Sequence, residues 1–373
     1  MKILLGGIPL GCDNIGDEAI IACVVKMLKS SLPAAELAVA TADPGTAERL
    51  GVKTVPPYGF VDTPTSGFAR EVVRHDAFIW CGATGLSDYP HIPLSLLEMA
   101  QMAGKKTFVW GVGMDDELNP VFFKVRGKRR ALLRMFGLVG KYEAWLRRRL
   151  SRRLAKILPA CGGVWLRDPE SRACLASMGF SGAKVGADTA IMLRPPAEAA
   201  PRSDDRRVLG LCISTQRQVS DLDGLKKMIA SVVAAGWKIV GIPMNPKTDR
   251  RLLESLGVEC IAGDTPEAVV EAAQKCDAVL SSRLHLLILA ANAGTQGFGI
   301  ARGSKLANWL ANFGRKVVGS VYDCDWNRVT EEILASPKNE ESWRTVRDKA
   351  YAALDERLET ARKELVAKLE ETA

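Results

Sequence analysis

Short apolar runs alternate with segments of helical spacing along most of this chain. Continuous apolar runs such as ELAVAT and DAFIWC, each followed by small or polar residues, are typical of strands buried in a parallel sheet. The segments between them, such as AIIACVVKMLKSSL, place apolar residues three and four positions apart, which predicts helices. Strands that alternate with helices in this way predict a mostly parallel α/β fold.

The alternation is interrupted once, at residues 194–207, where RPPAEAAPRSDDRR lacks periodicity and predicts a linker. The length of 373 residues is sufficient for two domains. We therefore expect a Rossmann-like domain over residues 1–195, a second over 204–338, and a C-terminal helix over 339–373. Two such domains would face a cleft at the carboxyl ends of their sheets, where open α/β sheets bind ligands.

Nine cysteines occur singly, without a C-x-x-C pair, which argues against a zinc site or a thioredoxin-like motif. No apolar run reaches the roughly 18 residues that a membrane-spanning helix needs. The opening residues MKILLGGIPLGC predict a buried strand and a loop, because the apolar segment is too short for a signal peptide. These features favour a cytoplasmic protein that needs no metal.

The net charge of +8 is concentrated between Lys124 and Lys156, where thirteen lysines and arginines accompany one acid, Glu143. This insert mixes Leu, Phe, Met and Trp with arginine at helical spacing, and a basic amphipathic helix is typical of an anionic membrane surface. A solvated face packed on the domain is the alternative. Nucleic acid is disfavoured, because the chain contains no recognised nucleic-acid module and the charge is confined to one insert.

The loop GIPLGCDNIGDEA after the first predicted strand has neither a dinucleotide fingerprint nor a P-loop. Asp13, Asn14 and Asp17 in this loop could bind hydroxyl groups of a polar acceptor such as a sugar, or the loop could be a tight turn before a capped helix. Gly82 and Thr84, and the later GVG turn, follow other predicted strands. We expect these glycine turns to form one backbone wall that contacts the acceptor.

The stretch SSRLHLLILAANAG follows a predicted strand and starts a helix, so Arg283 and His285 are expected in the first helical turn, near its free N–H groups. Arginine binds phosphate or carboxylate, and histidine can transfer a proton near neutral pH. Ser281 and Ser282 add hydroxyl groups and a predicted N-cap. A purely structural arginine here would need a buried acidic partner that the sequence does not identify, so we favour an anion site.

The later stretch GIARGSKLANWL repeats the order of strand, glycine loop and helix. If its strand neighbours the preceding one, Arg302 and Lys305 face the same anion site as Arg283. The alternative is that they are solvated loop charges.

Taken with DNIGDEAI, WLRDPESRACLASMGF, GADTAIML and IPMNPKTD, these motifs run in order over most of the chain, which resembles the polysaccharide pyruvyl transferases. The resemblance implies a glycosyltransferase-B-like fold of two Rossmann-like domains. It also implies transfer of the three-carbon unit of phosphoenolpyruvate onto two sugar hydroxyls as a cyclic ketal, with release of phosphate. Phosphoenolpyruvate is then a co-substrate, and no cofactor is expected.

The resemblance further implies that Arg283 holds the carboxylate or phosphate of phosphoenolpyruvate and that Lys305 neutralises the phosphate. Arg217 lies near a position where family members carry an arginine, so it joins the expected donor-binding residues with Arg302, Ser281 and Ser282. His285 is the expected general acid. Asp17, or Asp13, from the opposite wall would orient or deprotonate the acceptor.

Two loops depart from the family pattern: CGATG replaces a glycine run, and ARGSK keeps only the lysine of a Tyr-Asp-Pro-Lys loop. A glycosyltransferase that uses a nucleotide-sugar, and a non-catalytic glycan- or anion-binding relative, therefore remain as alternatives. The expected acceptor is a saccharide of a cell-envelope or exopolysaccharide precursor, free or lipid-linked, modified in the cytoplasm, including at the inner face of the membrane.

Overall fold

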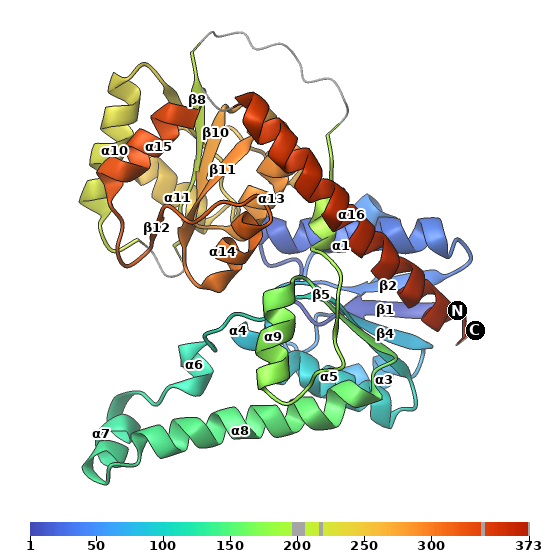
Figure 1. Ribbon diagram of the computed structural model, residues 1–373. Helices are drawn as coiled ribbons and strands as arrows, with labels where there is room; N and C mark the ends of the chain where they lie inside the picture. The colour runs from blue at the N-terminus through green and yellow to red at the C-terminus, as the bar shows by residue number, and fades with distance from the viewer. Residues whose placement is uncertain (196–205, 216–218, 337–339, 372–373) are drawn as a thin grey trace. The chain divides into compact units, whose positions relative to one another are not determined.

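The computed structural model of the protein describes residues 1–195, 206–215, 219–336 and 340–371 (Figure 1). The chain forms two compact units. Unit 1 comprises Met1–Cys12, Val24–Asp188 and Arg357–Ala373, and unit 2 comprises Asp13–Cys23 and Thr189–Glu356. Most of the predicted linker lies outside the described residues.

Unit 1 contains a parallel seven-stranded sheet with the order β3-β2-β1-β4-β5-β6-β7. Its strands are β1 (Lys2–Gly6), β2 (Glu36–Ala40), β3 (Lys53–Val55), β4 (Ala77–Cys81), β5 (Lys106–Val112), β6 (Gly163–Leu166) and β7 (Lys184–Val185). The central strand β4 is buried at every position, which explains its continuous apolar sequence. The strand order reverses direction at β1, as in a doubly wound Rossmann sheet.

The helices that lie wholly in unit 1 are mostly short, and the longest are α5 and α8 (Figure 1). They are α2 (Thr46–Leu50), α3 (Phe68–Val72), α4 (Gly85–Asp88), α5 (His91–Met102), α6 (Pro120–Phe123), α7 (Gly127–Met135), α8 (Val139–Ile157) and α9 (Pro169–Ser177), with 3-10 turns at Thr65–Gly67 and Leu158–Ala160. Helix α1 (Ile15–Ser31) belongs to unit 2 up to Cys23 and to unit 1 from Val24.

Unit 2 contains a parallel five-stranded sheet with the order β12-β11-β10-β8-β9. Its strands are β8 (Val208–Cys212), β9 (Lys238–Gly241), β10 (Ala278–Ser281), β11 (Gln296–Ala301) and β12 (Gly319–Ser320). Its helices are α10 (Leu222–Ala234), α11 (Thr248–Ser255), α12 (Pro266–Gln274), α13 (Leu284–Asn292), α14 (Ser304–Ala311) and α15 (Trp326–Ala335), with a 3-10 turn at Thr189–Met192. Strand β8 pairs with β9 on one side and β10 on the other, so the order reverses there.

The structure differs from the sequence-based expectations in three details. Residues 13–23, expected within the first domain, pack in unit 2, and α16 (Glu340–Glu370) is divided between the units at Arg357. The basic insert forms two helices, α7 and α8, rather than one, with Gly137 at a φ of 63° in the turn between them.

Each helix of the described residues is too short or too polar to cross a lipid bilayer.

Asn292 fixes the end of α13 inside unit 2. Its side-chain amide donates to the carbonyls of Ala190 and Leu193, each at 2.8 Å, and its oxygen accepts from the hydroxyl of Tyr351. Asn292 is almost fully buried, so these bonds replace water that cannot reach it. Because α13 carries His285 in its first turn, Asn292 also sets the position of that histidine.

We predict that Asn292→Ala lowers the free energy of unfolding by roughly 2–4 kcal/mol, because it leaves buried carbonyls without their donor. Urea denaturation measures the loss. Asn327→Ala, at an exposed position of α15, serves as the control and should change stability by less than about 0.5 kcal/mol. Equal stability of the two variants would show that the Asn292 bonds are not needed.

Candidate active site

The candidate site of unit 2 lies where β8 and β10 end side by side. Ser282 N donates to the carbonyl of Cys212 at 3.0 Å, and Ser214 N donates to the Ser282 hydroxyl at 2.8 Å. This is the topological switch point of the sheet, the place where doubly wound folds bind ligands. The two strand ends are therefore locked together by hydrogen bonds that come from the chain itself.

The two serines predicted to bind the donor bond the backbone instead. The Ser281 hydroxyl accepts from Arg283 N and donates to the Arg283 carbonyl, both at 2.9 Å. Ser281 and Ser282 are fully buried. Neither is the N-cap of α13, because the residue at that position is Arg283. Their role in this structure is to shape the turn that presents Arg283.

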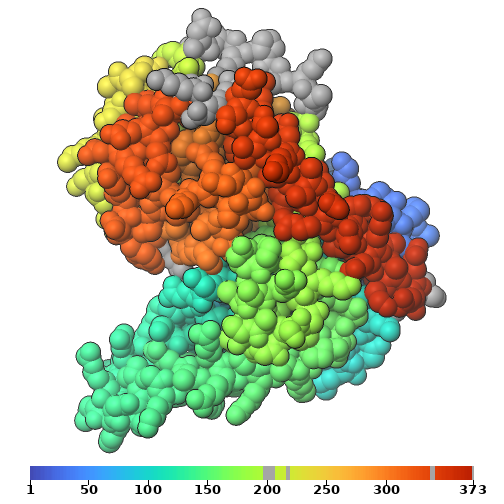
Figure 2. Space-filling model, in the orientation of Figure 1, coloured from blue at the N-terminus to red at the C-terminus, as the bar shows by residue number. Residues whose placement is uncertain are grey.

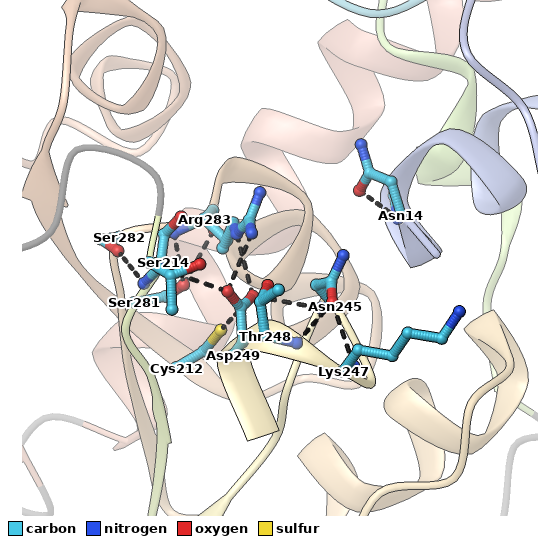
Figure 3. Close-up of polar contacts among 12 residues, drawn as sticks. Asn14, Cys212, Ser214, Asn245, Lys247, Thr248, Asp249, Ser281, Ser282 and Arg283 are labelled. Carbon is cyan, nitrogen blue, oxygen red and sulfur yellow. Dashed lines mark hydrogen bonds and ion pairs between the residues drawn. The ribbon is translucent and has the colours of Figure 1, made fainter. Parts of the chain in front are cut away.

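Arg283 has the acidic partner that the sequence did not identify. Its Nε and Nη2 donate to the two carboxylate oxygens of Asp249, at 3.0 and 2.8 Å (Figure 3). Asp249 is fully buried, and the Arg283 side chain is 13% exposed. The argument that Arg283 must bind a ligand because no acid was available to it is therefore wrong.

Asp249 lies in the first turn of α11, and its carboxylate accepts hydrogen bonds from residues of three loops. It accepts from Asn245 N at 3.1 Å and from Thr215 N at 3.4 Å, in addition to Arg283. The Asn245 side-chain oxygen accepts from Lys247 N and Thr248 N just before and at the start of α11 (Figure 3). Asp249 is the site residue that sequence reasoning missed, although it ends the motif IPMNPKTD on which the family resemblance partly rests.

The pairing with Asp249 does not use all of the Arg283 guanidinium. Arginine has five N–H donors, and two of them bond Asp249. The carboxylate fixes the plane of the guanidinium, so the donors on its other edge keep one direction. An arginine held in this way is preorganised for a second, external anion.

His285 is the second residue of α13 and is partly buried. A Cβ built on Gly16 would collide with its imidazole ring, which means that the ring lies directly against the first turn of α1. The glycine of the motif DNIGDEAI therefore makes room for a histidine that is far away in sequence. Asn14, just before α1, accepts from Gly16 N with its side-chain oxygen and caps this helix.

Asp17 lies in the same first turn of α1 and is buried. Burial raises the pKa of the Asp17 carboxyl, and the positive charge of His285, the amide of Asn14 and the charge of Lys305 oppose that rise only in part. Asn14 donates to Asp17 at 2.7 Å. A carboxyl with a raised pKa is a stronger base than an ordinary aspartate, which suits it to proton transfer.

The opening loop is fixed to unit 2 by two contacts. Ile15 N donates to the Met244 carbonyl at 3.1 Å, and Asp13 pairs with the Lys247 ammonium at 2.7 Å. Asp17, which we expected on an opposite domain wall, therefore belongs to the same unit as His285. Asp13 makes a surface ion pair, which leaves Asp17 as the better candidate for chemistry.

Arg302 and Lys305 come to the same sheet edge because β11 pairs with β10. The Arg302 Nη1 donates to the Ser214 hydroxyl at 2.9 Å, and the charge of Lys305 acts on Asp17. The strand pairing on which the expected convergence with Arg283 depends is therefore present, and the predicted anion-binding role of these cations stays a prediction. Arg217 lies outside the described residues, and its predicted role stays a prediction.

The glycine turns of unit 1 accommodate side chains of the chain itself. A Cβ on Gly7 or Gly85 would collide with Trp80, and one on Gly113 would collide with Arg167. Gly82 takes a φ of 65° and donates to the Trp110 carbonyl at 2.7 Å, and Thr84 is buried at the start of α4. The turns thus have a packing role, and the expected contact of Gly82 and Thr84 with an acceptor stays a prediction.

The motif WLRDPES forms a second buried charge cluster, in unit 1. Arg167 lies 3.1 Å from Asp168 and 3.8 Å from Asp188. Asp168 also caps α9 by accepting from Ser171 N at 2.6 Å. Since Arg167 is buried among carboxylates of the same unit, we assign this part of the family pattern to the structure of unit 1.

A model of the family described as polysaccharide pyruvyl transferase matches residues 14–304. The chain belongs to this family. No curated protein matches it. The matched range contains Asp17, Asp249, Arg283, His285 and Arg302 and ends at Ser304, directly before Lys305. Membership of this family makes the protein a transferase of polysaccharide biosynthesis.

Solved structures share its fold at low sequence identity. A putative UDP-N-acetylglucosamine 2-epimerase from Listeria monocytogenes has a TM-score of 0.60 and 11% identity, over 93% of this chain and 90% of its own. The UDP-GlcNAc 2-epimerase from Neisseria meningitidis has a TM-score of 0.58 and 13% identity, over the whole of both chains. A glycosyltransferase from Rickettsia africae ESF-5 has a TM-score of 0.58 and 8% identity, over 100% of this chain and 98% of its own. These likenesses confirm the predicted α/β fold of two Rossmann-like units of glycosyltransferase-B type.

We predict strong coupling between Arg283 and Asp249 in unfolding experiments. Arg283→Ala and Asp249→Ala should each cost roughly 3–5 kcal/mol, because each leaves the other charge buried without its partner. The double variant should lose less than the sum of the two, by about 1–3 kcal/mol, since it leaves neither charge behind. Strictly additive losses in urea denaturation would contradict the pairing.

The raised pKa of Asp17 predicts a pH dependence of stability. The folded state binds the Asp17 proton more tightly than the unfolded state, so this group lowers stability as pH rises above the ordinary aspartate pKa of about 4. Asp17→Asn removes this term. The melting temperature of the variant minus that of the wild type should therefore increase from pH 4 upward and level off once Asp17 is ionised. A difference independent of pH would contradict the shift.

Proposed function

We propose that this protein transfers the pyruvyl group of phosphoenolpyruvate to two hydroxyls of a saccharide, as a ketal, with release of phosphate. The observation that carries the proposal is the placement of Arg283 and His285 at the switch point of unit 2, where Gly16 of the turn that contains Asp17 lies against His285 and the strand before Lys305 pairs with the strand before Arg283. This arrangement combines cations for a small dianion with two groups that can transfer protons. Family membership supports the same reaction.

The donor's two anionic groups match the two kinds of cation in the site. The outward donors of Arg283, held in place by Asp249, bind the carboxylate of phosphoenolpyruvate. Arg302 and Lys305, at the end of the neighbouring strand, bind its phosphate. Because Asp249 balances the charge of Arg283, the phosphate is drawn toward Arg302 and Lys305.

The reaction requires one proton to be given and two to be removed. His285 protonates the methylene carbon of the donor, and the electrophile that forms at C2 is attacked by one sugar hydroxyl. Phosphate leaves with the C2–O electron pair, and the second hydroxyl then attacks C2 and closes the ketal. Asp17 accepts a hydroxyl proton, and the departing phosphate takes up the other.

The proposed acceptor is a saccharide of a cell-envelope or exopolysaccharide precursor, free or lipid-linked. Asn14 donates to Asp17 and orients the carboxylate of the proposed base. The proposed place of action is the cytoplasm, including the inner face of the membrane. A nucleotide-sugar as donor would need a binding partner for a base and a ribose, and none of the site residues that the structure describes provides a feature that favours it over phosphoenolpyruvate.

The test measures binding of phosphoenolpyruvate by thermal shift and calorimetry. Phosphoenolpyruvate should raise the melting temperature of the wild type, and Lys305→Met should weaken its affinity by about tenfold to a hundredfold, because one charge-assisted bond is lost. Lys226→Met, at an exposed lysine of α10 in the same unit, is the matched control and should bind as the wild type does. Arg283→Ala is unsuitable as the sole variant, because it also unbalances the buried Asp249.

UDP-N-acetylglucosamine serves as the competing ligand. A shift with this nucleotide-sugar alone would favour a glycosyltransferase, and the absence of a shift with either ligand would contradict catalysis with phosphoenolpyruvate. A loss of affinity in Lys226→Met equal to that in Lys305→Met would show that the site lies elsewhere.

A further inference from the structure

Residues 120–149 of unit 1, here called the arm, combine two surface properties, positive charge and exposed apolar area. The arm contains α6, α7 and the first half of α8, with α7 at the far end of α8 from the sheet (Figure 1). The end of α8 nearest the sheet is held firmly: Leu150, Leu154 and Ile157 are buried, and Lys156 pairs with Glu98 at 2.7 Å. The arm is thus a supported projection of unit 1 (Figure 2).

The first property is charge. The arm carries ten lysines and arginines, and every one of them is exposed. Its one acid, Glu143, pairs with Lys124 at 3.3 Å and accepts from Val125 N at 3.1 Å. The outer surface of the arm is therefore strongly positive, with its acid occupied in holding the arm together.

The second property is exposed apolar area. Of the fourteen large hydrophobic side chains that are exposed among the described residues, seven lie in the arm. Leu132, Met135 and Phe136 are 56%, 78% and 65% exposed and are spaced three and four residues apart, so they form one stripe along and just beyond α7. The other four are Val121, Phe122, Leu138 and Trp145. No residue of α7 is buried, so packing on unit 1 does not explain the stripe.

A pocket lies at the base of this surface. It has a volume of about 360 Å³ and is lined by Lys124, Arg126 and Arg130, with Glu143 on the opposite helix. Because Glu143 pairs with Lys124, the net positive charge at this cavity comes from Arg126 and Arg130, which favours an anion such as a phosphate group. The pocket and the apolar stripe of α7 belong to adjacent parts of the same arm.

We propose that the arm is a docking surface for an anionic lipid bilayer. The stripe of Leu132, Met135 and Phe136 enters the boundary between headgroups and acyl chains, and the basic side chains face the anionic headgroups. The pocket lined by Arg126 and Arg130 receives the phosphate of one headgroup. A merely solvated helix would not expose this stripe, and a nucleic-acid surface would have no use for it.

Lipid docking extends the proposed function without depending on it. The bilayer attracts the arm whether or not unit 2 binds phosphoenolpyruvate, so vesicle binding and donor binding can fail separately. If both hold, the arm brings the transferase to the surface at which a lipid-linked saccharide is presented.

The test is co-sedimentation of the full chain with vesicles of phosphatidylcholine, with and without phosphatidylglycerol. We expect binding only to vesicles that contain phosphatidylglycerol, and loss of binding as salt rises from about 0.1 M to 1 M. Arg126→Gln with Arg130→Gln should weaken binding by roughly fivefold for each residue. The triple variant Leu132→Ser, Met135→Ser, Phe136→Ser should weaken it by at least about tenfold.

Matched controls come from other exposed positions. Met102→Ser, at an 83% exposed methionine of unit 1, and Lys226→Gln with Lys275→Gln in unit 2 should bind vesicles as the wild type does. Equal binding to both kinds of vesicle, or unchanged binding by the arm variants, would overturn the proposal. So would a dimer in size-exclusion chromatography that the triple variant abolishes, together with no vesicle binding, because the stripe would then be a protein interface.

Discussion

The bidentate pair between Arg283 and Asp249 organises the candidate site. It joins the turn after β10 to the first turn of α11, and Asn245, which donates to Asp249, lies next to the carbonyl of Met244 that anchors the opening loop. A buried ion pair of this kind adds little net stability, but its two halves cannot be separated without a large cost. Its main consequence is therefore geometric: the guanidinium keeps one orientation before any ligand arrives.

The pair also sets the charge balance of the site. With Arg283 balanced by Asp249 and with the pKa of Asp17 raised by burial, the cationic character of the site depends on Arg302 and Lys305. Such a balance suits a small anionic donor that binds through its carboxylate and phosphate and loses only the phosphate in the proposed reaction. His285, seated against the helix start that contains Gly16 and Asp17, lies beside a carboxyl with which it can share the proton transfers.

Much of the architecture could be predicted from the sequence, because buried parallel strands and amphipathic helices have distinct periodicities. The placement of Lys305 on the side of Arg283 was expected only if their two strands were neighbours, and β10 and β11 do pair. The pairing of Arg283 with Asp249 could not be predicted, because 34 residues separate the two in sequence. An aspartate in the first turn of a helix is also common without any such partner. The sequence also could not predict that Asp17 belongs to unit 2, because this depends on tertiary contacts of Ile15 and Gly16 rather than on the local sequence pattern. The role of the glycines in unit 1 required the positions of Trp80 and Arg167.

The central claim is that a small dianion binds at the switch point of unit 2, against a preorganised arginine. A crystal structure of the protein with phosphoenolpyruvate tests it most directly. We predict that the carboxylate lies within hydrogen-bond distance of Arg283, that the phosphate contacts Lys305, and that the Arg283–Asp249 pair is unchanged. Phosphoenolpyruvate bound elsewhere, or an Arg283 that leaves Asp249 to reach it, would contradict the account.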